Sequence, residues 1–186
     1  MRTFIAVDLD PAIKSVLLDF IQRLKKMGEP KVGWAKESGM HLTLKFLGEI
    51  DEDQAVRVKE CVASVAGMVA AFPLKIRGTG FFPQNARHPR VLWVGTSVEP
   101  VLQELQRELE SRLAALGFPR EERAFHPHLT LGRVKSPGGL QDVISELERN
   151  ASTEFGEMTV RKITLFRSTL KPTGAEYSIL EEGRLK

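Results

Sequence analysis

The sequence contains a single cysteine, Cys61, among its 186 residues. An intrachain disulfide is therefore excluded, and so is a zinc site built from cysteine pairs. No apolar run approaches the roughly 20 residues that a membrane-spanning helix needs. The first residues, Met1–Asp8, place an acid early and carry no small-residue cleavage site, so they predict no signal peptide. These absences predict a cytoplasmic protein that does not associate with membranes.

Several motifs that mark common enzyme classes are also missing. The chain has no G-x-x-x-x-G-K-[ST] and no G-x-G-x-x-G sequence, so it lacks the usual phosphate loops of ATP and dinucleotide sites. It has no G-x-S-x-G and no H-E-x-x-H, which excludes two frequent hydrolase patterns. His126 and His128 can chelate a metal in principle, but a zinc site needs three or four ligands. The sequence therefore predicts no cofactor and no metal.

The composition is that of an ordinary globular protein. Hydrophobic residues make up 42% of the chain and charged residues 27%, and the length suits one domain or two small lobes. The net charge is +3, and the isoelectric point is about 9.1. This mild excess of base is compatible with a polyanionic partner and equally with an ordinary surface.

Strand-like and helix-like segments alternate along the chain. Apolar residues at helical spacing predict four helices, which are one from Pro11 after an Asp10 cap, one capped by Asp51, one through Leu102–Leu113 and one through Leu140–Leu147. Strands are predicted at Thr3–Leu9, Met40–Leu47, Pro73–Phe81, Arg90–Gly95, His128–Val134, Glu157–Phe166 and Ala175–Leu180. Helices mixed with long, partly alternating strands predict an α+β fold, although the strand order stays open.

One tetrapeptide occurs twice. The chain has four histidines, and two of them open the copies His41-Leu42-Thr43-Leu44 and His128-Leu129-Thr130-Leu131. Each copy lies in a strand-like run that a predicted helix follows. The repeat predicts two related halves, each of which supplies one strand to a shared site.

The repeat has a simple geometry in a strand. Alternate side chains point to opposite faces, so His41 shares a face with Thr43, and His128 shares a face with Thr130. Same-face neighbours are roughly 6.5–7 Å apart at the backbone, so both side chains can reach one phosphate. One copy alone is typical of an ordinary half-buried strand, whereas the recurrence of a rare residue favours an active site.

Two histidines across a shared site suit phosphodiester cleavage. One can act as the base that activates the nucleophile, and the other as the acid that protonates the leaving oxygen. An ordinary imidazole pKa of about 6.5 keeps both forms accessible near neutral pH. The hydroxyls of Thr43 and Thr130 can donate hydrogen bonds to phosphate oxygens, where charge grows in the transition state.

Two cations near the motifs are candidates for binding substrate. Lys45 is expected on the face of His41, where its charge can approach a phosphate or simply meet solvent. Arg133 lies on the face opposite His128 if the strand stays regular, although Gly132 can break that regularity.

Aromatic residues supply a second kind of candidate. Phe82 and Phe125 can stack on a base, as aromatic side chains do in single-stranded RNA recognition. Trp93 lies within the apolar run Val91–Val94 and is expected in the core.

The sequence resembles the RNA 2′,3′-cyclic phosphodiesterase family, also called the 2′–5′ RNA ligase family, of the two-histidine phosphoesterase superfamily. The resemblance spans essentially the whole chain through the segments Arg2–Val7, His41–Gly48, Phe82-Pro83, Pro89–Trp93, Phe125–Arg133, Leu165–Leu170, and Gly174 with Tyr177. It implies a bilobal α+β fold, in which two antiparallel sheets with flanking helices and pseudo-twofold symmetry surround a central cleft. Residues 1–186 would form a single two-lobed domain, with each lobe supplying one HxTx motif, 41–44 and 128–131.

The resemblance also implies an activity. Family members open a terminal 2′,3′-cyclic phosphate to a 2′-phosphomonoester without metal, and some join or cleave 2′–5′ linkages in tRNA halves reversibly. By matching position, His41 would donate a proton to the departing 3′ oxygen, and His128 would accept the proton of water. Thr43 and Thr130 would hold the phosphate.

The partner that the resemblance implies is RNA, as tRNA fragments or other cyclic-phosphate ends, bound by a monomer whose cleft also accepts nucleotides. Two alternatives stay open. One is an RNA-end-binding module without turnover, and the other is the same chemistry on a small cyclic-phosphate nucleotide.

Overall fold

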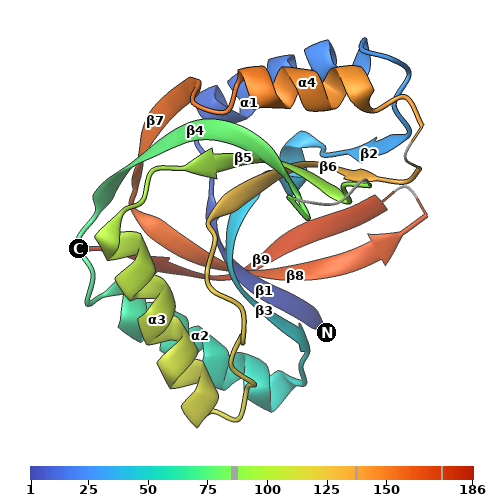
Figure 1. Cartoon of the computed structure of the whole chain (residues 1–186). Coiled ribbons are helices and arrows are strands. Elements are labelled where there is room, and N and C mark those ends of the chain that lie inside the picture. The colour runs from blue at the N-terminus through green and yellow to red at the C-terminus, as the bar shows by residue number, and fades with distance from the viewer. Residues whose placement is uncertain (85–87, 137, 173) are drawn as a thin grey trace.

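The structure, a computed structural model, describes residues 1–84, 88–136, 138–172 and 174–186. These residues form four α-helices, one 3₁₀ turn and nine strands (Figure 1). In chain order the elements are β1 (Arg2–Asp8), α1 (Pro11–Lys25), β2 (Val32–Trp34), η1 (Glu37–Gly39), β3 (His41–Glu49), α2 (Glu52–Ala66), β4 (Phe72–Phe82), β5 (Val91–Thr96), α3 (Pro100–Ala115), β6 (His128–Val134), α4 (Gln141–Arg149), β7 (Glu154–Val160), β8 (Lys162–Lys171) and β9 (Gly174–Arg184).

The described strands form two sheets, in which all neighbouring pairs are antiparallel. The four-stranded sheet has the order β3-β1-β8-β9, and the five-stranded sheet has the order β2-β6-β5-β4-β7. The predicted α+β class with two antiparallel sheets is confirmed. The first motif begins β3 and the second begins β6, so each sheet contributes one histidine.

The helices cover the sheets in pairs. α2 and α3 lie on the four-stranded sheet, whereas α1 and α4 lie on the five-stranded sheet (Figure 1). α1 follows β1 in the chain but packs against β7 of the other sheet, and α3 follows β5 but packs against β3. In each half of the chain, therefore, one helix follows a strand of one sheet and packs on the other sheet, which links the two sheets.

The start of α2 follows directly from its sequence. The Asp51 carboxylate accepts a hydrogen bond from the backbone N–H of Gln54 at 2.7 Å, and the Gln54 side chain accepts one from the Asp51 N–H at 3.0 Å. This capping box satisfies two N–H groups that a helix start would otherwise leave unpaired. The predicted cap at Asp51 is confirmed. Asp10 occupies the cap position of α1, but its side chain makes no capping hydrogen bond.

Apolar side chains form one large core and one small cluster. The large core lies between the sheets and their helices, and it includes the motif leucines Leu42, Leu44, Leu129 and Leu131. The small cluster consists of Phe4, Ala6 and Phe166, with Tyr177 packed against it. Because Phe4 and Ala6 alternate with the core residue Ile5 along β1, the small cluster lies on the opposite face of the four-stranded sheet.

The prediction of one strand over Glu157–Phe166 is wrong. β7 ends at Val160 and β8 begins at Lys162, and these two strands belong to different sheets. Arg161 is the crossover, and no glycine or proline beside it signals a turn. β2 escapes prediction because three residues are too few to establish a period.

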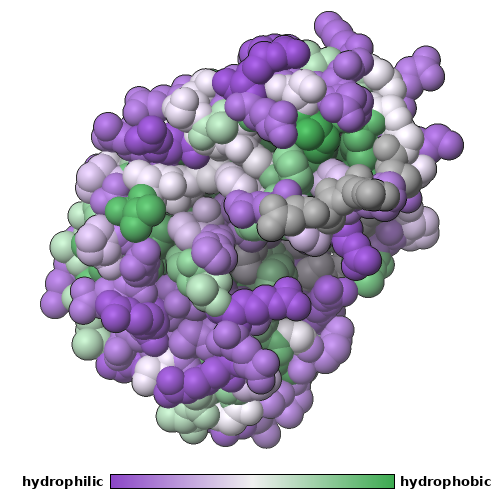
Figure 2. All heavy atoms as spheres, in the orientation of Figure 1, coloured by the Kyte–Doolittle hydropathy of each residue, from purple (hydrophilic) through white to green (hydrophobic). Residues whose placement is uncertain are grey.

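The surface is predominantly polar on the face that Figure 2 shows, with small separate hydrophobic areas. Within the described ranges, no helix combines the length and the apolar character that crossing a bilayer requires.

Candidate active site

The two motif strands come from different sheets but pack against each other. β3 begins at His41 and β6 begins at His128, and the two strands are in contact. The fold therefore brings together two segments that lie nearly half a chain apart. The shared site that the repeat predicts has a structural basis in this contact.

The expected alternation within each motif is present. The four motif leucines are at most 4% exposed, whereas the histidines and threonines of both motifs are only half-buried. Within the described part of the chain, neither the Thr43 nor the Thr130 hydroxyl has a hydrogen-bond partner. Both hydroxyls are therefore free to donate to a ligand.

Aromatic rings surround His41. Its imidazole centroid lies 4.6 Å from the ring of Phe4, 5.3 Å from Tyr177 and 5.9 Å from Phe166. These rings belong to the small cluster on the face of the four-stranded sheet opposite the large core. None of these neighbours is identifiable from the sequence alone, because they depend on the pairing of β3, β1, β8 and β9.

This environment changes the protonation of His41. Burial lowers the pKa of His41 from 6.5 to about 4, the nearby Asp8 carboxylate acts to raise it, and the Lys14 ammonium acts to lower it. Asp8 pairs with His41 across the sheet, and Lys14 Nζ lies 2.8 Å from the Asp8 carboxylate. At neutral pH the free protein therefore holds His41 as a neutral imidazole.

His128 has a different kind of neighbour. Its Nδ1 lies 2.7 Å from the backbone carbonyl oxygen of His126. A carbonyl oxygen can only accept, so the Nδ1 carries the hydrogen and donates it. In the neutral ring this leaves the lone pair on Nε2, which is the arrangement of a general base. The sequence offers His126 only as a possible metal chelator and gives no sign of this role.

A bulge at the fourth motif position reshapes β3. Thr43 pairs with Ala6 of β1 and Lys45 pairs with Ile5, which leaves Leu44 as an extra residue. Lys45 therefore turns to the core side, where it is 7% exposed and its Nζ lies 2.9 Å from the Glu110 carboxylate. The expectation that Lys45 shares a face with His41 is wrong, because a bulge shifts every later side chain to the other face.

Phe46 takes the place that Lys45 was expected to fill. It pairs with Phe4, its ring centroid lies 5.8 Å from that ring, and its side chain is 62% exposed. An exposed aromatic ring thus lies on the face that carries His41. The sequence does not predict this position, because regular alternation along the strand places Phe46 on the same face as the buried leucines.

The second motif contains the same bulge. Thr130 pairs with Trp93 of β5 and Gly132 pairs with Leu92, so Leu131 is the extra residue. Arg133 consequently pairs with Val91 and lies exposed on the face of Thr130. The regular-strand expectation places Arg133 on the opposite face and is wrong, whereas the suspected irregularity near Gly132 is present.

The two aromatic candidates have different positions. Phe82 ends β4, and its ring centroid lies 5.2 Å from the His128 ring and 5.3 Å from that of Trp93. Trp93 is half-buried on the face of Thr130 rather than enclosed in the core. Phe125 is half-buried and packs against the large core instead.

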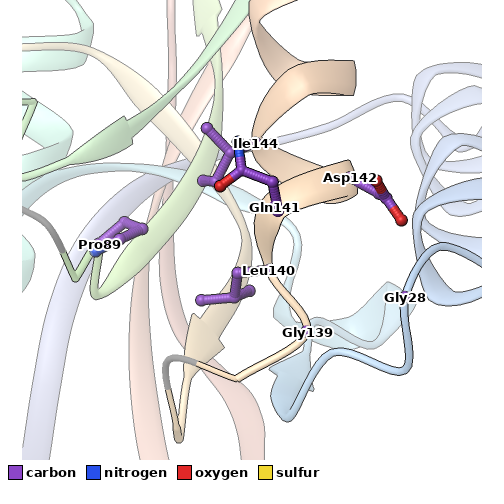
Figure 3. Close-up of a pocket in the computed structure, with 7 residues that line it drawn as sticks. All are labelled: Gly28, Pro89, Gly139, Leu140, Gln141, Asp142 and Ile144. Carbon is purple, nitrogen blue, oxygen red and sulfur yellow. The ribbon is translucent and has the colours of Figure 1, made fainter.

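Two cavities lie away from the motifs. One of about 230 Å³ lies where α4 begins (Figure 3), lined by Gly28, Pro89, Gly139, Leu140, Gln141, Asp142 and Ile144. Another of about 590 Å³ lies between the end of β1 and the β7–β8 turn. Neither His41 nor His128 lines either cavity. In the described residues, no group of three or more His, Cys, Asp or Glu side chains is placed to hold a metal ion.

Comparisons with known proteins agree with this arrangement. The family model described as the 2′-5′ RNA ligase superfamily matches residues 13–172. The chain is 36% identical over 191 residues to a protein named RNA 2′,3′-cyclic phosphodiesterase from Methanothermobacter thermautotrophicus, with 100% of this chain and 99% of that protein covered. A protein of the same name from Thermotoga maritima is 36% identical over 183 residues, covering 98% of this chain and 94% of that protein.

Solved structures show the same fold. TT0787 of Thermus thermophilus superimposes with a TM-score of 0.83 and 30% identity, covering 100% of this chain and 98% of that one. E. coli LigT, solved in complex with 3′-AMP, superimposes with a TM-score of 0.78 and 24% identity, covering 100% and 98%. From the family model and the relatives together, the chain belongs to the 2′-5′ RNA ligase superfamily, among relatives named RNA 2′,3′-cyclic phosphodiesterase.

Proposed function

We propose that the protein hydrolyses 2′,3′-cyclic phosphate ends of RNA to 2′-phosphomonoesters, using His41 and His128 as acid and base. The observation that carries this proposal is the contact between β3 and β6, each of which opens with a half-buried histidine and threonine. Residues 1–186 act as one two-lobed unit in this proposal, and each lobe supplies one motif.

His128 is the proton acceptor. Its Nδ1–H donates to the His126 carbonyl, so the Nε2 lone pair is available to take a proton from water. As the water oxygen bonds to phosphorus, the bond from phosphorus to the 3′ oxygen breaks. The proton of water moves to His128.

His41 is the proton donor. The free imidazole is neutral at pH 7 because its pKa is about 4, so it must gain a proton when substrate binds. The negative charge of the cyclic phosphate supplies the reason, since an anion beside an imidazole favours the protonated form. His41 then passes that proton to the departing 3′ oxygen, and the 2′ phosphate ester remains.

Other residues on the same faces bind the substrate. The Thr43 and Thr130 hydroxyls donate to the non-bridging oxygens, where negative charge increases in the transition state. Arg133 supplies positive charge beside the second motif, and the rings of Phe46 and Phe82 offer surfaces on which a base can stack. Neither Lys45, which is paired with Glu110, nor Phe125, which packs on the core, has this role in the proposal.

The same proton transfers permit 2′–5′ ligation. A 5′ hydroxyl that replaces water as the nucleophile would form a 2′–5′ linkage, and the reverse steps would cleave it. The metal independence, the monomeric state and the cytoplasmic location expected from the sequence are part of this proposal.

The test is an assay of the EDTA-treated protein on an oligonucleotide that ends in a 2′,3′-cyclic phosphate, with 2′- and 3′-phosphate products resolved. The proposal predicts a 2′-phosphate product without added metal. Tight binding with no turnover would instead favour an RNA-end-binding module, and turnover only with added metal would overturn the mechanism. A cyclic mononucleotide is assayed in parallel. A kcat/KM equal to that of the oligonucleotide would favour a small nucleotide substrate, because remote contacts raise kcat/KM for the true substrate.

A further inference from the structure

Lys45 is a buried cation that the reaction does not use. Its ammonium group lies 2.9 Å from the Glu110 carboxylate and donates to the Pro119 carbonyl oxygen at 2.7 Å. The side chains of Lys45 and Glu110 are only 7% and 13% exposed. A buried ammonium group is tolerated when it is paired and hydrogen-bonded. The ion pair joins β3, the strand of the first motif, to α3.

Glu110 connects this pair to the next part of the chain. Its Oε2 also accepts a hydrogen bond from the backbone N–H of Glu121 at 3.3 Å, and its Oε1 accepts one from Gln106 at 3.4 Å. Lys45 and Glu110 therefore bind the chain at residues 119 and 121. These positions belong to the connector, residues 116–127, which leads from the end of α3 to the start of β6.

Besides this attachment, two phenylalanines hold the connector: Phe118 near its first end is 7% exposed and lies in the large core, and Phe125 near its second end packs against that core. The connector contains no helix or strand, and residues 119–124 are all exposed. Figure 1 shows it running separately from the lower end of α3 up to β6. Because exposed, irregular segments have few contacts to restrain them, the attachment at Lys45 and Glu110 restrains the exposed stretch between the two phenylalanines.

The far end of the connector carries the group that orients the second histidine. Its residue His126 presents the carbonyl that accepts the Nδ1–H of His128 at 2.7 Å. We propose that Lys45 is a positioning residue, which fastens the connector so that the His126 carbonyl holds His128 in one tautomer and orientation. The strand that begins with one catalytic histidine would thus help to position the other.

The equivalent position in the second motif supports a specific role for Lys45. The bulges place Lys45 in β3 and Gly132 in β6 at the same position, one residue after the extra leucine. A Cβ at Gly132 would lie 2.5 Å from Val32, so this position has no room for a side chain. The second motif therefore has no counterpart of the Lys45 attachment.

The test separates positioning from the cost of burying one unpaired charge. Lys45→Met alone would leave the Glu110 carboxylate buried without its partner. The main variant is therefore the double change Lys45→Met with Glu110→Met, since replacing both members of a buried pair by apolar residues is often neutral for folding. The matched control is Glu146→Gln. Glu146 is a buried carboxylate on α4 that pairs with Arg23 and Arg149, far from the connector in sequence.

Two measurements are made on each variant that melts above the assay temperature. The double variant is expected to lose about tenfold or more in kcat on a cyclic mononucleotide with KM changed less than about threefold, since small misplacements of a catalytic group are costly. Nitrogen-15 NMR of the His128 ring is expected to show a reduced fraction of the Nδ1–H tautomer. Glu146→Gln is expected to keep both values, and Lys45→Arg should retain most of the activity.

The inference rests on the proposed function only for its kinetic part. If the wild-type protein turns over no cyclic phosphate, the proposed function fails, while the NMR measurement still tests the attachment. An unchanged His128 tautomer together with kcat within about twofold of wild type in the folded double variant would overturn the inference. So would an equal loss of kcat in Glu146→Gln.

Discussion

His41 and His128 open identical tetrapeptides, yet the two imidazoles lie in different surroundings. His41 packs among the rings of Phe4, Phe166 and Tyr177 and has a pKa lowered by burial to about 4. His128 instead donates its Nδ1–H to a backbone carbonyl. The motif supplies the same residue twice, and the surrounding strands make one copy a half-buried, neutral imidazole packed among aromatic rings and the other a ring of fixed tautomer.

The two motif strands also differ at the fifth residue after each histidine. Both strands bulge at the second leucine, which turns Phe46 in β3 and Arg133 in β6 onto the faces of the histidines. One motif thus ends in an exposed aromatic ring and the other in an exposed cation. The repeated backbone geometry supplies unlike groups on the two faces, which suits a substrate that has a base at one point and phosphates at others.

Removing either histidine should have the largest effect. His41→Ala and His128→Ala are each expected to lower kcat by ~10²–10⁴-fold on a cyclic-phosphate oligonucleotide, because positioned acid–base groups contribute that much. His88→Ala, at an exposed histidine outside both motifs, is the control and should keep kcat within about twofold. A loss smaller than about tenfold at either motif histidine would contradict the paired roles.

The pH dependence of folding should reveal the lowered pKa of His41. Unfolded chains bind a proton at His41 below about pH 6.5, whereas the folded protein binds it only near pH 4. The stability that neutral His41 contributes is therefore complete above pH 6.5 and is lost as the pH falls to about 4, an effect of about 3 kcal/mol. His41→Gln should reduce the acid-induced loss in the free energy of unfolding by about that amount, as measured by urea unfolding at both ends of this range. An equal loss in both proteins would show that His41 is not buried in this way.

The threonines should have the next largest effect. Thr43→Val and Thr130→Val keep the branched shape but remove the donor, and each is expected to lower kcat by ~10–100-fold with little change in KM. Thr159→Val, at an exposed threonine of β7, provides the comparison. If one motif threonine matters and the other does not, the two motifs divide the phosphate unequally, and if neither matters the proposed phosphate contacts are wrong.

The exposed ring should have the smallest effect. Phe46→Ala is expected to raise KM about fivefold for a cyclic mononucleotide with kcat nearly unchanged, since stacking on an aromatic ring contributes about 1–3 kcal/mol per base. Leu170→Ala removes a 70% exposed apolar side chain from the same sheet and should change neither constant. The effect of Phe46→Ala should disappear with a ribose cyclic phosphate that has no base. An equal rise in KM for that compound would assign Phe46 a structural role.

Much of the site could be predicted because it depends on local patterns. The alternation of polar and apolar residues places His41 with Thr43 and His128 with Thr130, and the buried leucines follow the same rule. The cap at Asp51 depends on four consecutive residues and is equally local. Such features need only the period of a strand or the hydrogen bonds of one helical turn.

The remaining features depend on pairing between distant strands. A bulge is visible only in the register of two strands, so the sequence misplaces Lys45 and Arg133 and overlooks Phe46. The ring cluster around His41 joins residues from four strands. The division of Glu157–Phe166 between two sheets likewise follows from tertiary packing, which no local pattern records.

The proton-donor role of His41 can be tested by an NMR titration of its imidazole, first in the free protein and then with a nucleoside 2′-monophosphate bound. We expect a pKa of about 4 in the free protein and a higher pKa in the complex. Asp8→Asn should lower the pKa further, because the Asp8 carboxylate acts to raise it. A free-protein pKa near 6.5 that changes neither with the bound phosphate nor with the Asp8 substitution would contradict the proposal that His41 becomes protonated when substrate binds.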